Sequence, residues 1–199
     1  MTERPSFAGK SPYLLLGLAI LVLDQWSKWL VEEKLPMPSA VEVIPNLLNF
    51  VHVRNTGVAF GLFASHGDTT GTLILIGLGL LALSFVVYYF AITPLWDRLL
   101  LVSLGLVLGG AIGNLVDRIA QGGVTDFIDF YYGTYHWHTF NVADSAISVG
   151  IGLMLLGAFR QPPPDSEETT ASEAASDDAA ADGEPDPSDG AEPSPQPEA

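Results

Sequence analysis

The chain has 199 residues, of which 48% are hydrophobic, and it carries a formal net charge of -15 at pH 7. Twelve of the 23 acidic residues, but none of the eight basic ones, follow residue 160, so the acidity is a property of the C-terminal tail and says little about a substrate. The absence of cysteine excludes disulfides, thiolate nucleophiles and cysteine-ligated metal sites.

Four apolar runs are long enough to cross a bilayer as helices, which takes roughly 20 residues: residues 13–31, 70–92, 99–116 and 142–159. The first run contains Asp24 and Lys28, and the fourth contains Asp144 near its start. The first run is too long for a secretory signal, and no small-residue cleavage site follows it, so we interpret it as a retained span. The pattern predicts a mainly α-helical membrane protein with four transmembrane helices.

Basic residues near the ends of the spans predict the orientation, because cytoplasmic ends carry an excess of Lys and Arg. If the helices alternate, one side carries Arg4, Lys10, Arg98 and Arg160. The other side carries Lys34, Arg54 and Arg118. The last two lie in polar motifs that suggest a function, and setting them aside leaves the excess on the first side. We therefore expect both termini in the cytoplasm.

Residues 1–160 then form one membrane domain, and residues 161–199 form an acidic cytoplasmic tail. The tail is rich in Pro, Ala, Ser, Asp and Glu and has no aromatic or large aliphatic residue. Such a segment cannot bury enough apolar surface to offset the entropy cost of ordering it, so we predict that it is disordered.

Two extracytoplasmic segments follow from this topology. Residues 32–69 are rich in β-branched and aromatic residues, and Asn55, Thr56 and Gly57 predict a turn between two extended pieces. This segment indicates a small sheet or hairpin on the membrane surface. Residues 118–141 contain the stretch GGVTDFIDFYYG and a run of Tyr, Trp and Phe, which is typical of a loop at the headgroup level.

Ionisable residues inside a span are costly, and they suggest a functional site by default. Asp24 and Lys28 are four residues apart, so they share one face of the first helix and can form a pair that is either structural or in contact with a ligand. Asp144 has a simpler explanation as well, because an acid in the first turn of a helix capped by Asn141 suits the helix dipole.

Further polar residues follow the third span. Asn114, Asp117 and Arg118 share one helix face, and alone they would suggest an interfacial ion pair. Asp126 and Asp129, taken alone, would be solvated loop acids. Alternating spans, however, bring all of these clusters to one side of the membrane. Polar residues that were only exposed to water would not need to share one side. This convergence favours an active site.

Carboxylates near the bilayer boundary, without Ser/His or Cys/His partners, indicate acid–base chemistry on water. Two of them held close together in a poorly hydrated site cannot easily both ionise, and they share one proton near neutral pH. A metal site formed by His136, His138 and an aspartate is an alternative. No HExxH-like spacing supports it, so we expect neither a metal nor another cofactor.

Five ordered segments of the chain resemble those of the bacterial lipoprotein signal peptidases, also called signal peptidase II: DQWSKWLV, VRNTGVAFGLF, GGAIGNLVDRI, GGVTDFIDFY and FNVADSAISVG. The resemblance covers residues 13–159 and leaves out the acidic tail. It implies an aspartyl endopeptidase of the bacterial cytoplasmic membrane that works without a metal or a covalent intermediate. Such an enzyme removes the signal peptide from diacylglyceryl-modified prolipoproteins by cutting before the lipidated cysteine.

The resemblance also assigns roles to residues of this chain. It implies that Asp126 and Asp144 are the catalytic pair and that Asp129 is not part of it. The supporting polar residues of the family correspond to Asn55, Gly57, Asn114, Arg118, Asn141, Asp24 and Lys28. The implied partners are prolipoprotein substrates and membrane lipid, with the active site on the extracytoplasmic side. We expect a monomer and no nucleic-acid partner.

Two other functions are weighed beside this one. A small proton-coupled transporter would use the intramembrane acids as a relay, although the uncharged second span and the clustering of the acids on one side disfavour it. A non-catalytic membrane scaffold would recruit basic partners through the tail. Deletion of residues 161–199 would then abolish its function, whereas a peptidase would survive the loss.

Overall fold

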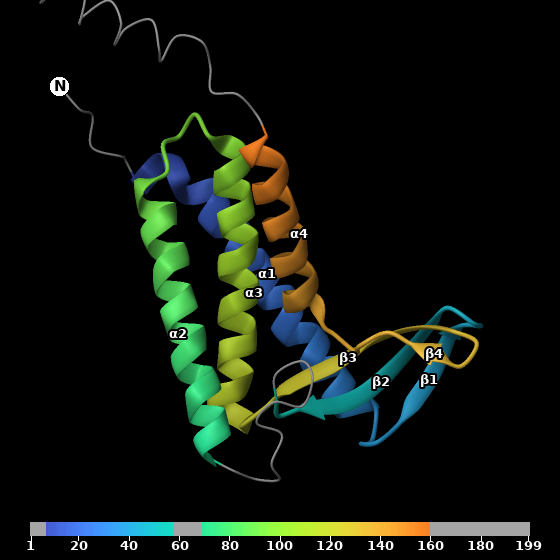
Figure 1. Cartoon of the computed structure of the whole chain (residues 1–199). Coiled ribbons are helices and arrows are strands. Elements are labelled where there is room, and N and C mark those ends of the chain that lie inside the picture. Colours follow the sequence, from blue (N-terminus) through green and yellow to red (C-terminus); the bar gives the residue numbers. More distant parts are fainter. Residues whose placement is uncertain (1–6, 58–68, 160–199) are drawn as a thin grey trace, which may run out of the picture. The chain divides into compact units, whose positions relative to one another are not determined.

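The computed structural model describes residues 7–57 and 69–159. The predicted tail, residues 161–199, lies outside the described residues. Figure 1 shows that the described helices stand side by side and that a small sheet extends from one end of them. This arrangement places the sheet next to the start of the last helix, where polar residues gather.

The described residues form four helices: α1 (Phe7–Lys34), α2 (Thr69–Ile92), α3 (Arg98–Gln121) and α4 (Val142–Ala158). Stretches of α1, α2 and α3 are long and apolar enough to cross a membrane, whereas α4 is a shorter apolar helix. Length and composition therefore support the first three predicted spans. A membrane crossing by α4 stays a prediction.

The third helix extends beyond the predicted residue 116 and includes Asp117 and Arg118. It ends at Gly122, which has a left-handed φ of 72° and donates its backbone N–H to the carbonyl of Arg118 at 3.1 Å. Glycine is favoured here because a side chain would strain this conformation. The cap turns the chain directly from α3 into the sheet.

α3 lies at the centre of the helical part, because it packs against α1, α2 and α4. A buried apolar cluster joins Phe90 of α2 to Leu101, Leu104 and Leu108 of α3. α4 approaches α3 very closely: a Cβ at Gly110 would lie 2.5 Å from the carbonyl oxygen of Ala143. Large apolar side chains on the outer faces of α1 and α2 are exposed, as on helices that face lipid.

The described strands form one antiparallel sheet in the order β1 (Ala40–Ile44), β2 (Leu48–Asn55), β3 (Val124–Tyr132) and β4 (Tyr135–His136). β1 and β2 form a hairpin, and β2 pairs with β3 from Leu48 opposite Phe130 to Asn55 opposite Val124. The predicted small sheet is confirmed. The β2–β3 pairing joins the two segments that were expected to lie between the spans.

The structure corrects one detail of the sequence interpretation and adds another. Residues 118–141 are not mainly an aromatic loop, because the end of α3 and strands β3 and β4 occupy most of them and β2 satisfies the backbone of β3. The structure also has a hairpin turn at residues 45–47, between β1 and β2, where Asn46 has a φ of 58°. The turn predicted at residues 55–57 begins at the last residue of β2, and the extended piece predicted after it lies outside the described residues.

Candidate active site

Asp126 lies on β3 and is buried, with 2% of its surface exposed. Its Oδ2 accepts a hydrogen bond from Asn55 Nδ2 at 3.0 Å, and its Oδ1 accepts one from Asn141 Nδ2 at 2.9 Å. Burial raises the pKa of this carboxyl from 3.8 to about 6, against the opposing effect of the Asn55 hydrogen bond and with a further increase from the charge of Asp144. Asp126 can therefore hold or release a proton near neutral pH.

Asp144 lies in the first turn of α4, where it and Asn141 cap the helix reciprocally. The backbone nitrogen of Asp144 donates to Asn141 Oδ1 at 3.0 Å, and the backbone nitrogen of Asn141 donates to Asp144 Oδ2 at 3.3 Å. The predicted cap is thus confirmed. The second carboxylate oxygen, Oδ1, accepts a hydrogen bond from Asn114 Nδ2 at 2.7 Å. Asp144 therefore both caps α4 and belongs to the polar site.

Asn114 and Asn141 connect the two aspartates to the rest of the bundle. Asn114 Oδ1 accepts from Lys28 Nζ at 3.1 Å and from Asn141 Nδ2 at 3.2 Å. These two donors require an oxygen at that position, so the nitrogen of the Asn114 amide faces Asp144. The contacts fix the orientation of both amides and, through them, the positions of the carboxylates.

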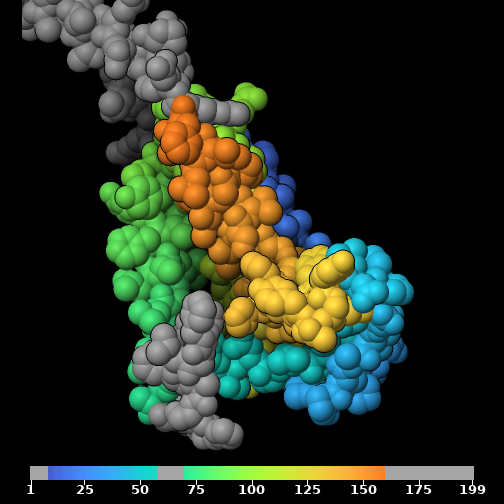
Figure 2. All heavy atoms as spheres, turned by 45° about the vertical axis from the view of Figure 1, so that its right-hand side comes forward, coloured from blue at the N-terminus to red at the C-terminus, as the bar shows by residue number. Residues whose placement is uncertain are grey.

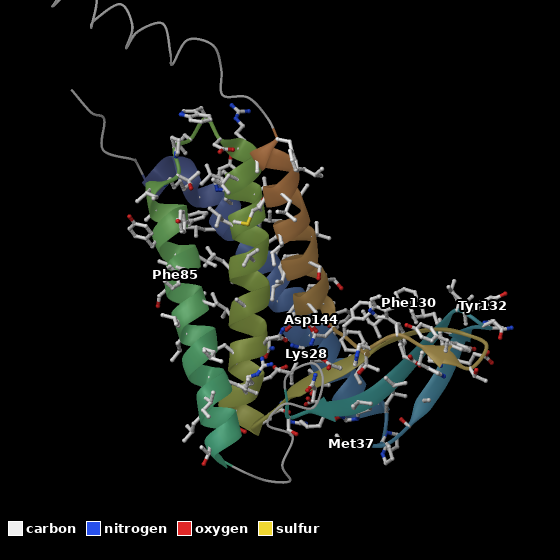
Figure 3. All side chains as sticks on the ribbon, in the orientation of Figure 1. Lys28, Met37, Phe85, Phe130, Tyr132 and Asp144 are labelled. Carbon is white, nitrogen blue, oxygen red and sulfur yellow. The ribbon has the colours of Figure 1, made fainter. Side chains whose placement is uncertain are left out.

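Asp24 and Lys28 form the pair predicted from their spacing, and the structure adds a third partner. Lys28 Nζ lies 2.7 Å from Asp24 Oδ2 and 2.8 Å from Asp117 Oδ2, and all three side chains are buried. Asp24 Oδ1 also accepts from the backbone nitrogen of Ala143 at 2.9 Å, which ties α1 to the start of α4. Figure 3 shows Lys28 and Asp144 at the level where the helices meet the sheet.

Asp126 and Asp144 line one cavity of about 440 Å³. Figure 2 shows the surface hollowed between α2 and the start of α4, and residues of both helices line the cavity. Its wall among the described residues comprises Asn55, Gly57, Leu75, Arg118, Asp126, Trp137, His138, Thr139, Phe140, Asp144, Ser145 and Ser148. The cavity therefore lies between the polar residues at one end of the bundle and the apolar helix α2, which contributes Leu75.

Among the predicted site residues, Asn55, Gly57 and Arg118 line the cavity with the two aspartates, whereas Asp24 and Lys28 do not belong to the described wall. Arg118 donates from Nη1 to the backbone oxygen of Asn114 at 3.1 Å. Its positive charge also interacts with both Asp144 and Asp126. Arg118 therefore compensates part of the negative charge that the aspartates bring into the cavity.

The remaining predicted acid, Asp129, is also buried but has different partners. It accepts hydrogen bonds from Asn49 Nδ2 at 3.0 Å and from His136 Nδ1 at 2.9 Å. His138 instead lies in the cavity wall. Within residues 7–57 and 69–159, no three His, Asp or Glu side chains converge as a metal site would require. The metal alternative therefore finds no support in the geometry.

Sequence reasoning missed one part of the site. Asp117 was interpreted as part of an interfacial ion pair with Arg118, but it is buried against Lys28. Its position one helical turn after Asn114 was the available signal. Residues 137–140 belong to the aromatic segment that was predicted at the headgroup level, and they line the cavity.

Apolar helices that hold aspartates in a polar cavity at one end define a membrane protein with a two-carboxylate site. The model of the signal peptidase (SPase) II family matches residues 16–160. A lipoprotein signal peptidase of Solibacter usitatus is 44% identical over 146 residues, covering 72% of this chain and 89% of that protein. One from Symbiobacterium thermophilum is 40% identical over 143 residues, covering 72% of this chain and 91% of its own. The chain belongs to the signal peptidase II family.

Solved structures agree with this assignment. A bacterial membrane enzyme matches with a TM-score of 0.66 and 29% identity, covering 76% of this chain and 95% of that chain. A second one matches with a TM-score of 0.63 and 31% identity, covering 74% and 87%. The family membership confirms the predicted resemblance and supports a peptidase rather than the transporter alternative.

Proposed function

We propose that this chain is an aspartyl endopeptidase that removes the signal peptide from diacylglyceryl-modified prolipoproteins, cutting before the lipidated cysteine. The name shared by its relatives, lipoprotein signal peptidase, supports the substrate class. The observation that carries the aspartyl mechanism is the presence of Asp126 and Asp144 in the wall of one cavity, with an amide donor on each carboxylate.

In the proposed mechanism Asp126 and Asp144 share one proton, because two carboxylates in one poorly hydrated cavity do not easily both ionise. The ionised member takes a proton from a water molecule, whose oxygen bonds to the scissile carbonyl carbon, while the protonated member gives its proton to the carbonyl oxygen. As the C–N bond breaks, the first carboxyl passes its proton to the departing nitrogen. The second takes its proton back from the oxygen as the carbonyl re-forms, so the pair returns to its starting state.

The neighbouring polar groups hold this pair in place and orient the substrate. Asn114 and Asn141 keep the carboxylates aligned through hydrogen bonds, and Asn55 and Arg118 lie in the cavity wall where a peptide backbone would bind. A positioned reacting group lowers the barrier because the entropy cost is met before the reaction. The substrate peptide lies in the cavity, and its lipid chains lie against the apolar outer faces of the helices.

The proposed location is the bacterial cytoplasmic membrane, with the site on the extracytoplasmic side and both termini in the cytoplasm. The sheet lies at one end of the helices, where α1 and α3 end and α4 begins (Figure 1). The cavity is lined by residues of that end, among them Arg118 and Asp144. Lys10 and Arg98 lie near the opposite end, at the start of α1 and α3. Basic residues favour the cytoplasmic side, which supports this orientation. The enzyme acts as a monomer in this proposal.

The test uses the purified chain in detergent with a prolipoprotein that either carries or lacks the diacylglyceryl group. We expect cleavage of the modified form alone, and mass spectrometry should find a product that begins with the lipidated cysteine. The unmodified prolipoprotein is the matched control. Equal cleavage of both forms, or a product that begins elsewhere, would contradict the proposed substrate.

A further inference from the structure

We propose that Asp129 and His136 are a positioning pair that sets one wall of the substrate cavity and so controls substrate affinity. This inference rests on the peptidase function proposed above and extends it. The pair lies outside the catalytic aspartates and takes no part in the proton transfers. It acts through the four residues that follow His136 in the chain, residues 137–140.

The pair is held by several contacts. Asp129 has only 4% of its surface exposed, and both of its oxygens lie within hydrogen-bond distance of His136 Nδ1, at 3.0 and 2.9 Å. Asn49 on β2 donates to Asp129 Oδ2 at 3.0 Å. The ring of His136 stacks on that of Tyr131, with centroids 5.2 Å apart and planes 12° apart. These contacts attach β4 to both β3 and β2.

The hairpin that carries His136 needs these side-chain contacts. β4 has only two residues, and it follows β3 after Gly133 and Thr134, with a φ of 60° at Gly133. Isolated two-stranded hairpins are marginally stable in water, and two paired residues provide few backbone hydrogen bonds. The bond from His136 to a buried carboxylate therefore fixes where the chain leaves the hairpin.

The chain that leaves the hairpin forms part of the cavity wall. Trp137, His138, Thr139 and Phe140 all line the cavity that contains Asp126 and Asp144. The backbone nitrogen of Trp137 donates to the oxygen of Phe130 at 2.8 Å, and that of Phe140 donates to the oxygen of Ile128 at 3.1 Å. The wall is thus held at its start by His136 and the backbone of Trp137, and at its end by the backbone of Phe140 and by Asn141, which holds Asp126.

Of these contacts, that of His136 acts on substrate binding and those of Asn141 act on the chemical step. Loss of the His136 anchor displaces the start of the wall but leaves the hydrogen bonds of Asn141 to Asp126 and to the backbone of Asp144 intact. The substrate should then bind more weakly while the chemical step proceeds at nearly the same rate. If Asp129 and His136 merely supported the fold, their loss would instead reduce the amount of active enzyme. The apparent kcat would then fall and KM would stay unchanged.

The kinetic test compares His136→Phe, Asp129→Asn and the double variant. Phenylalanine keeps the ring that stacks on Tyr131 but removes Nδ1, at a position that is half exposed. We expect KM to rise about 3- to 10-fold, as for the loss of one hydrogen bond, with kcat within about twofold of wild type. The KM of the double variant should not exceed that of the more affected single variant, because both substitutions remove the same interaction. Glu42→Gln, which alters a carboxylate that Tyr131 binds on β1, is the matched control.

A second measurement does not depend on activity. Hydrogen exchange of the intact protein should be faster at the Trp137 amide in His136→Phe than in wild type, and unchanged in Glu42→Gln. Unchanged KM, a lower kcat with unchanged KM, or unchanged exchange would overturn the positioning role. If wild type fails to cleave a diacylglyceryl-modified prolipoprotein, the proposed function fails, and the exchange measurement still decides whether the pair holds the wall.

Discussion

Asn141 donates a 2.9 Å hydrogen bond from its side-chain nitrogen to Asp126, while its side-chain oxygen caps the helix that begins with the next residue. One amide therefore joins the strand that carries Asp126 to the helix that carries Asp144. Because the nitrogen and oxygen of an amide cannot exchange roles without breaking both contacts, the relative position of the carboxylates is set by this residue.

The first prediction concerns the catalytic pair. Asp126→Asn and Asp144→Asn should each lower kcat for the modified prolipoprotein by at least about 100-fold, since each removes a group that transfers a proton. Asp129→Asn should retain measurable activity, because Asp129 lies outside the described cavity wall and bonds to His136. Cleavage assays at equal amounts of folded protein provide the measurement. Full activity in either Asp126→Asn or Asp144→Asn would rule out the assignment.

The second prediction concerns pH and the stability of the fold. The pKa of Asp126 is about 6 in the folded protein, above the value of 3.8 for an ordinary carboxyl. The folded state therefore binds this proton more tightly than the unfolded state. The raised pKa contributes on the order of 3 kcal/mol to the free energy of unfolding at low pH. This contribution is fully present below about pH 4 and is lost as the pH rises through about 6.

Unfolding of wild type and Asp126→Asn in detergent, followed between pH 4 and pH 8, would measure this contribution. The unfolding free energy of wild type should fall relative to that of the variant as the pH rises through this window. Parallel curves would show that Asp126 does not have a raised pKa.

The third prediction concerns the buried lysine. Lys28→Met leaves Asp24 and Asp117 buried without their cation, which typically costs about 3–5 kcal/mol. We expect a large loss of folded protein, measured by thermal unfolding in detergent. The combined variant Lys28→Met/Asp117→Asn should recover part of the stability, because one of the uncompensated charges is removed. A Lys28→Met protein with wild-type stability and no activity would instead place Lys28 in contact with the substrate.

The fourth prediction concerns the packing of α3 against α4. Gly110→Ala puts a Cβ 2.5 Å from the carbonyl oxygen of Ala143, so α4 must shift. Overpacking of this kind costs about 1–3 kcal/mol, and the shift moves the first turn, which carries Asp144. Activity and Tm should both fall. Gly152→Ala is the matched control, since no atom lies within 4 Å of the added Cβ. Equal effects of the two changes would contradict the packing argument.

Much of the helical fold and of the site could be predicted from the sequence. The long apolar runs identified α1, α2 and α3, and the motif around Asn141 identified the cap of α4. The strand that carries Asp126 was not predicted, and residues 118–141 were interpreted as a loop. Its backbone partner is β2, which lies far away in the chain, so the pairing leaves no local signal.

For the polar side chains, too, local contacts could be predicted and contacts between distant parts of the chain could not. The spacing of Asp24 and Lys28 was sufficient to predict that they pair, because residues four apart on a helix are neighbours. It could not show that Lys28 also binds Asp117, since that contact exists only when α1 packs against α3. Likewise, periodicity and topology left Asp126 and Asp129 equivalent as interfacial acids, and only the family resemblance separated them. Their different partners appear only when the sheet and α4 come together.

By itself, the sequence determined the membrane class, the helices and the candidate carboxylates, because apolar length, helical spacing and local motifs act over a few neighbouring residues. The tertiary structure alone decided which of those polar groups line the cavity and which support it from behind. Packing of α3 against its neighbours and the register of β2 with β3 bring together atoms that are distant in the chain. Asp126 and Asp144 line one cavity for that reason, and Asp129 pairs with His136.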